Sequence, residues 1–326
     1  MSEVVEIRKR DIGADFIKFA ATLLVLNSHM GICYGDYSML ATGGAIGDAL
    51  FFFVSGFTLF MSSRKLDFVN WYKRRLGRIY PTILAMGLIA GLIFCDKAGY
   101  IEVMMADRYW FLQCILVCYL VLYPIIKYDL KMSICIPVSF LIMIAAFFLL
   151  FDFNGQLFYG QDTYFRWIFY FSIMMAGGGC SKCRNSLVYR WWHIPALLGC
   201  IAVWYGIVNV SKGGNLSILS YIPLVGVCVF TYLVGKAPWM EQLFDTKVIG
   251  NILFIVGGLC LDSYVVQFDI LESVSDKLNG IFPLNIPIIM IAVLVAAYLL
   301  HMLSNVISQI FDSKPFDWRQ MFLYKK

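Results

Sequence analysis

The first apolar stretch of the chain carries four polar side chains at spacings that place them on one face of a helix. Lys18 and His29 are separated by three helical turns plus about 20°, and Asp15 and Thr22 fall within about 40° of His29. Ionisable groups at membrane depth are costly and usually face a protein interior or a wet cavity. Histidine is the side chain best suited to moving a proton near neutral pH, so His29 is the predicted general base. Packing of this histidine against a neighbouring helix is the structural alternative.

A second polar cluster is basic. The segment 71–81 contains Lys73, Arg74, Arg75 and Arg78. Such charges can simply mark a cytoplasmic loop or meet anionic lipid. If the segment is helical, however, Arg74 and Arg75 lie four and three residues before Arg78, so the three guanidinium groups can converge. Because guanidinium groups suit phosphates, this cluster predicts a phosphorylated cytosolic ligand.

The elements that must position these residues are membrane-spanning helices. Of the 326 residues, 60% are hydrophobic and only 14% are charged, and the mean hydropathy is +0.75. A soluble domain carries about 25% charged residues, and a spanning helix needs roughly 20 apolar residues. We therefore predict an all-α polytopic membrane protein, with residues 1–326 forming a single transmembrane domain. About ten spanning segments can be read: 16–33, 46–61, 79–95, 109–126, 133–151, 165–180, 191–208, 216–235, 248–269 and 284–308.

The positive charges predict the orientation of these segments. With the N-terminus in the cytoplasm, most of the 26 lysines and arginines fall in cytoplasmic tails and loops. Only Lys97, Arg108, Arg166, Lys212 and Lys277 are assigned to the outer face. This bias favours an even number of helices with both termini cytoplasmic. The lone Cys180–Cys183 pair is weak evidence for a metal, and none is expected.

Several motifs resemble, in order, those of the membrane-bound acyltransferase 3 family. The first helix has the family's pattern of an acidic residue, a basic residue and a histidine, as Asp15, Lys18 and His29. The second has Phe52, Phe53, Val54, Ser55 and Gly56 where the family has Phe-Phe-x-x-Ser-Gly. An Arg-x-x-Arg-x-x-Pro motif follows, and later segments contain Trp110-Phe111-Leu112, Tyr119 and Ser263-Tyr264. The resemblance covers residues 8–305, nearly the whole chain.

The resemblance implies an enzyme that moves an acyl group, with acetyl expected, from cytosolic acyl-CoA to a hydroxyl of a cell-surface or exported glycan. The expected location is a bacterial inner membrane, with acyl-CoA as co-substrate, no bound cofactor, and neither metal nor nucleic acid. His29 would be catalytic. The expected substrate-binding residues are Asp15, Lys18, Arg74, Arg75, Arg78, Trp110, Gln113, Tyr264 and Gln267. Many relatives have a histidine where this chain has Gln267. A transporter or flippase for a glycan or lipid-linked intermediate is the alternative function, although the sequence has no inverted repeat.

Overall fold

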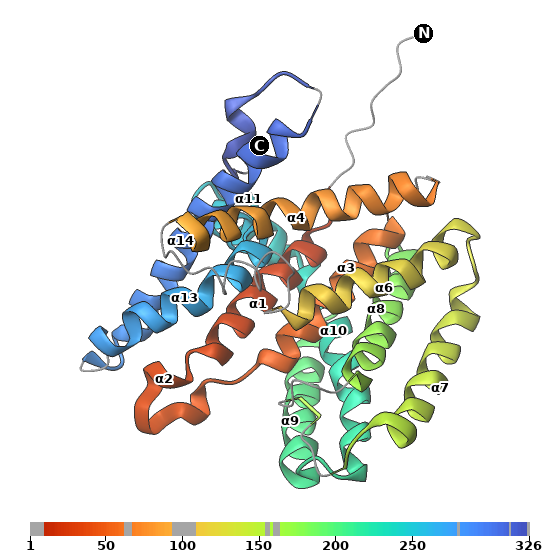
Figure 1. The fold of residues 1–326 in the computed structure, drawn as a ribbon. Coiled ribbons are helices and arrows are strands. Elements are labelled where there is room, and N and C mark those ends of the chain that lie inside the picture. Colours follow the sequence, from red (N-terminus) through yellow and green to blue (C-terminus); the bar gives the residue numbers. More distant parts are fainter. Residues whose placement is uncertain are drawn as a thin grey trace.

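The computed structural model describes residues 10–61, 67–92, 109–153, 157–158, 164–278, 281–312 and 314–324. Within these ranges every regular element is a helix, which confirms the all-α prediction (Figure 1). The α-helices are α1 (Ile12–His29), α2 (Gly31–Tyr34), α3 (Gly44–Met61), α4 (Phe68–Leu92), α6 (Trp110–Lys127), α7 (Met132–Leu150), α8 (Phe165–Cys183), α9 (His193–Ser211), α10 (Tyr221–Gly235), α11 (Pro238–Asp245), α12 (Ile249–Gly258), α13 (Cys260–Leu278) and α14 (Asn285–Ile310). Short 3₁₀ helices cover Gly35–Leu40, Asn215–Ser220 and Trp318–Met321.

The lengths and compositions of the helices are those of a multi-pass membrane protein. Six helical segments in the described part of the chain are long and apolar enough to cross a membrane, and the number rises to eight if two bent pairs each count as one span. The six include α3, α6, α7, α9 and α14, together with the segment Asn215–Gly235 that ends in α10. The predicted segments 79–95 and 165–180 correspond to α4 and α8, which are helical but less apolar.

The two bent pairs correct the predicted segments 16–33 and 248–269, which were each expected to be one helix. The chain turns by 68° after His29, and the following helices cover Gly31–Leu40. It turns by 75° between α12 and α13. A Cβ at Gly257 would lie 3.3 Å from the carbonyl oxygen of Asp15, and one at Gly258 would lie 2.4 Å from the Leu323 side chain. The second bend therefore follows two glycines at which other parts of the chain approach the backbone closely.

Helix α1 lies at the centre of the bundle and contacts α3, α10, α12 and α13 (Figure 1). Glycines permit the close packing of α3 on α8. A Cβ at Gly56 would lie 1.9 Å from the Met174 carbonyl oxygen, and one at Gly177 would lie 2.0 Å from the Phe53 carbonyl oxygen. In a membrane, where helix association depends on close backbone approach, such pairs of small residues fix the helix crossing.

Helix α4 is longer than the predicted segment 79–95 because it begins at Phe68 and includes the basic segment. Asp67 precedes it and accepts hydrogen bonds from the backbone nitrogen and side-chain amide of Asn70, at 3.2 and 2.7 Å. These bonds stabilise the carboxylate, so they lower the pKa of Asp67. The basic residues are therefore held in helical register, as the spacing of Arg74, Arg75 and Arg78 required.

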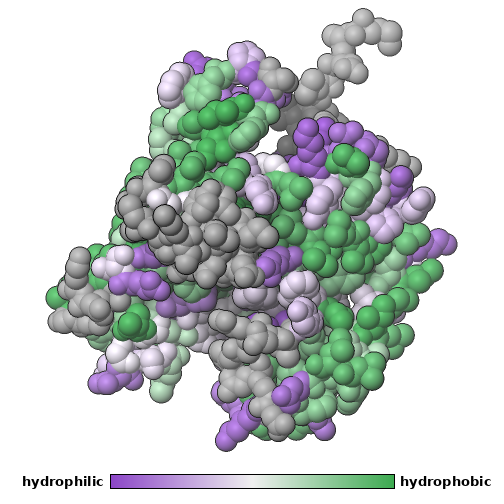
Figure 2. All heavy atoms as spheres, viewed as in Figure 1, coloured by the Kyte–Doolittle hydropathy of each residue, from purple (hydrophilic) through white to green (hydrophobic). Residues whose placement is uncertain are grey.

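Large apolar side chains cover the outside of the bundle. On α7 they include Leu141, Phe148 and Leu149, which are 63%, 62% and 80% exposed. Figure 2 shows hydrophobic residues over the flank where α6 and α7 lie. Exposed apolar faces of this extent suit contact with lipid. Arg10 and Leu323, near the two described ends of the chain, line one cavity and so lie at the same end of the bundle, as an even number of crossings requires.

Candidate active site

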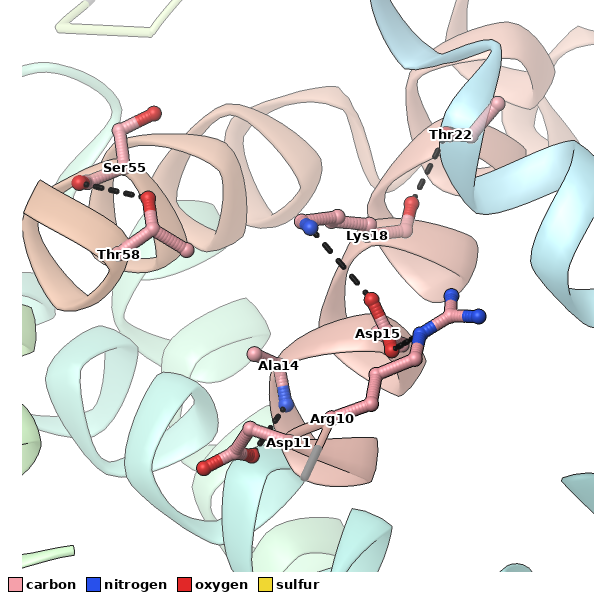
Figure 3. A network of polar contacts seen from close by, with 8 residues as sticks. All are labelled: Arg10, Asp11, Ala14, Asp15, Lys18, Thr22, Ser55 and Thr58. Carbon is pink, nitrogen blue, oxygen red and sulfur yellow. Dashed lines mark hydrogen bonds and ion pairs between the residues drawn. The ribbon is translucent and has the colours of Figure 1, made fainter. Parts of the chain in front are cut away.

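The first helix positions Asp15 and Lys18 in a polar cavity of about 690 Å³ at the end of the bundle that holds both described ends of the chain. Asp11 caps α1 by accepting a hydrogen bond from the Ala14 backbone nitrogen at 3.1 Å. One turn later, Asp15 forms ion pairs with Arg10 and, at 3.5 Å, with Lys18 (Figure 3). The cations on the wall are Arg10, Lys18, Arg184 and Lys236. They outnumber the two aspartates there, so the cavity favours an anionic ligand.

A smaller cavity of about 200 Å³ adjoins the first, because Lys18 and Thr58 line both. Figure 3 shows Lys18 between Asp15 and the Ser55–Thr58 turn of α3. Apart from Lys18, Arg78 is the one described cation on the wall of this smaller cavity, and the wall has few polar residues. The remaining lining is mostly apolar and comes from α3, α4, α6 and α13: Phe51, Val54, Ile79, Phe111, Leu112, Ile115, Leu261 and Tyr264. A cationic cavity thus adjoins a smaller, mostly apolar one.

His29 lies at the other end of α1, about 16 Å along the axis from Lys18 at 1.5 Å per residue. It is half-buried, and its ring meets the Phe268 ring edge to face with centroids 4.7 Å apart. Asn27 holds the adjacent loop by donating to the carbonyl oxygens of Leu40 and Thr42 at 2.8 and 3.0 Å. His29 lines neither of the two cavities. The structure therefore places Asp15 and Lys18 together and His29 separately, nearer the opposite end of the bundle.

The other predicted residues also divide into groups. Arg78 and Tyr264 line the apolar cavity, whereas Arg74 and Arg75 line neither cavity. Arg74 is exposed, and the guanidinium of Arg75 lies 5.1 Å from the Trp71 ring centroid. The expected convergence of all three arginines on one cavity is therefore not seen.

Helix α13 connects the apolar cavity to the level of His29. Tyr264 forms part of the cavity wall, and Gln267 and Phe268 follow on the next turn. Gln267 is only 1% exposed, and its amide nitrogen donates to the Tyr264 carbonyl oxygen at 3.3 Å. Trp110 and Gln113 lie half-buried in the first turn of α6. Of the predicted residues, Tyr264, Gln267, Trp110 and Gln113 thus belong to the interior between the two ends of α1.

Two polar clusters were missed by the sequence analysis. In one, Asp262 accepts a hydrogen bond from Thr82 at 2.9 Å and pairs with His301 Nδ1 at 2.9 Å, joining α4, α13 and α14. In the other, Asp48 on α3 interacts electrostatically with Arg166 on α8. The sequence analysis counted Arg166 among the loop charges of the outer face, whereas its side chain packs inside the bundle and is 6% exposed. The sequence signal that could have revealed these clusters was the presence of ionisable residues in or at the edge of apolar segments.

These features define a multi-pass helical membrane protein with a cationic cavity beside an apolar one. The model of the acyltransferase 3 family, described as an acyltransferase domain, matches residues 11–302. The chain therefore belongs to this family and is a membrane acyltransferase. Comparisons with curated proteins and with solved structures found no match.

Proposed function

We propose that this protein transfers an acyl group, with acetyl the expected one, from cytosolic acyl-CoA to a hydroxyl of a cell-surface or exported glycan in a bacterial inner membrane. The observation that supports this donor is that the two cavities adjoin each other at Lys18 and Thr58. Acyl-CoA has a phosphate-rich nucleotide at one end and a long, less polar arm that ends in the thioester. A cationic chamber followed by a narrow apolar one is complementary to that order.

In this proposal the donor phosphates lie against the cations of the larger cavity: Arg10, Lys18, Arg184 and Lys236. Arg78 lies at the apolar cavity, where the arm of the donor would enter. Asp15 holds Arg10 and Lys18 in place through its ion pairs. Arg74 and Arg75 lie near Arg78 on the same helix and add to the positive field that attracts the donor.

The arm then extends along α13, from Tyr264 toward the turn that contains Gln267 and Phe268. His29 accepts the proton of the acceptor hydroxyl while that oxygen forms a bond to the thioester carbonyl carbon. The carbon–sulfur bond of the resulting tetrahedral intermediate breaks, and the coenzyme A thiolate takes the proton back from His29. Gln267 has no basic nitrogen, so it can orient a substrate by hydrogen bonding but cannot replace a histidine base.

The test is thiol release from acetyl-CoA by purified protein in detergent, with a panel of neutral methyl glycosides as acceptors. We expect His29→Gln to reduce acceptor-dependent thiol release at least 100-fold, since loss of a general base typically costs 10²–10⁴-fold. His193→Gln is the matched control, because His193 lies on α9, where its Nδ1 accepts a hydrogen bond from the Arg190 backbone nitrogen at 3.0 Å. Thiol release by His29→Gln equal to that of the control would refute the role of His29.

A further inference from the structure

Asp48 and Arg166 place opposite charges inside the bundle without a direct contact between them. Asp48 lies one turn into α3, and Arg166 lies in the first turn of α8. They interact electrostatically, yet among the described residues neither takes part in an ion pair within 4.0 Å. Most buried charges in membrane proteins pair closely, because an unpaired charge away from water is costly. The separation of these two charges therefore needs an explanation.

Both groups also lack hydrogen bonds from the part of the chain that the structure describes. Arg166 is 94% buried, since its relative exposure is 6%, and its Nε has no hydrogen-bond partner. Its guanidinium lies 4.4 Å from the Trp110 ring centroid. Asp48 is half-buried, and its carboxylate oxygens are not among the fully enclosed, unpartnered side-chain atoms of the described residues. A carboxylate and a guanidinium thus stand apart with unused hydrogen-bonding capacity.

Aromatic rings surround the two charges. Tyr170 and Tyr264 both interact electrostatically with Asp48 and with Arg166, and the Trp110 and Tyr170 rings lie 5.9 Å apart. Aromatic faces beside hydrogen-bonding groups provide packing surface for a ligand that is partly apolar. Tyr264 also lines the apolar cavity, so this cluster adjoins the proposed path of the donor.

The cluster lies close to the level of His29. A Cβ at Gly47 would lie 2.6 Å from the Val25 side chain, so α3 and α1 are packed against each other at this point. Val25 precedes His29 by one helical turn, or about 6 Å. Asp48 follows Gly47 directly in α3. Asp48 therefore lies at a level along α1 within about one turn of the proposed base, toward the end of α1 that carries His29.

The chemistry of the pair selects the class of ligand. A hydroxyl both donates and accepts, so one hydroxyl, or two neighbouring ones, can donate to Asp48 and accept from Arg166. A carboxylate ligand paired with Arg166 would still be repelled by Asp48, and an ammonium ligand paired with Asp48 would still be repelled by Arg166, so a singly charged ligand gains little net attraction. We propose that Asp48 and Arg166, with Trp110 beside them, bind the acceptor as a neutral polyhydroxyl compound, such as an uncharged sugar ring. This inference rests on the proposed function, because it assigns the acceptor side of the same reaction.

The test compares Asp48→Asn, Arg166→Gln and the double variant, with methyl glucoside and methyl galactoside as neutral acceptors and glucuronate and glucosamine as charged ones. The neutral glycosides should be acetylated at least tenfold more efficiently than the charged sugars. Each variant should raise the KM for the neutral acceptor about tenfold or more, as expected for a lost hydrogen bond to a charged group, while the KM for acetyl-CoA stays within twofold. Asp129→Asn is the control, because Asp129 pairs with Lys182 at an exposed site.

The double variant distinguishes acceptor binding from an ion pair that only stabilises the fold. It removes both charges with little change in shape, so it would restore the acceptor KM if the pair were merely structural. That recovery, or an unchanged acceptor KM in the single variants, would overturn the proposal. If the wild-type protein releases no thiol with any acceptor, the proposed function fails. In that case, saturation-transfer NMR with methyl glucoside tests whether the site binds a neutral sugar. Binding to the wild-type protein that is lost in the double variant supports this site, and absence of binding to the wild-type protein overturns it.

Discussion

Replacement of Lys18 by glutamine should weaken binding of the acyl-CoA donor more than it affects binding of the acceptor. Among the described residues, Lys18 is the one cation that lines both cavities, and its Nζ lies 3.5 Å from Asp15 Oδ1 with the side chain 33% exposed. A hydrogen bond to a charged partner contributes about 1.5–3 kcal/mol. Because Asp15 already offsets part of the positive charge of Lys18 and solvent screens the rest, we expect a loss of binding free energy at the lower end of this range. About 1.4 kcal/mol corresponds to a tenfold change in affinity.

The assay measures thiol release at varied acetyl-CoA concentration, with the acceptor fixed. Lys18→Gln should raise the KM for acetyl-CoA about tenfold, and the difference from wild type should shrink at high salt as the phosphate interaction is screened. Lys182→Gln is the control, since Lys182 pairs with Asp129 at the surface, 2.6 Å away. An unchanged KM for acetyl-CoA in Lys18→Gln would refute the assignment of the larger cavity to the donor phosphates.

Three further variants test packing, the buried polar network and the apolar cavity. Gly177→Ala should lower the free energy of unfolding by about 1–3 kcal/mol, because its Cβ would lie 2.0 Å from a carbonyl oxygen of α3; an unchanged thermal midpoint in detergent would contradict this packing. His301→Gln should cost a similar amount by removing a hydrogen-bond partner of the buried Asp262, and Asp262→Asn in that background should then cost little more; additive losses in a double-mutant cycle would show that the two side chains are not coupled. Ile115→Ala should remove apolar surface that contacts the donor arm and raise the KM for acetyl-CoA about tenfold; an unchanged KM would exclude this cavity as the path of the arm.

The sequence predicted the class of fold because apolar length and low charge are direct requirements of a lipid environment. It placed Asp15 and Lys18 correctly as neighbours, since three residues on a helix bring side chains to the same face. It did not predict the bend after His29 or the break between α12 and α13. The break between α12 and α13 follows Gly257 and Gly258, at which distant segments pack closely, and hydropathy does not report such contacts.

The same reason explains the missed clusters. Asp48 and Arg166 are far apart in sequence, and so are Asp262 and His301. Each pair is brought near only because α3 packs on α8, or α13 on α14. Arg166 stands at the edge of its apolar segment, so a count of loop charges assigned it to the outer face. The helical spacing of Arg74, Arg75 and Arg78 was predicted, but their separate environments were not, because these depend on the neighbouring helices.

Transfer across the membrane is the central claim, and inverted membrane vesicles test it most directly. Acetyl-labelled acetyl-CoA is added outside, at the cytoplasmic face, and a neutral methyl glycoside is trapped inside. We predict that the wild-type protein places label on the trapped glycoside, that His29→Gln does not, and that His193→Gln does. Absence of label on the trapped glycoside with active wild-type protein, or equal labelling with His29→Gln, would contradict this account.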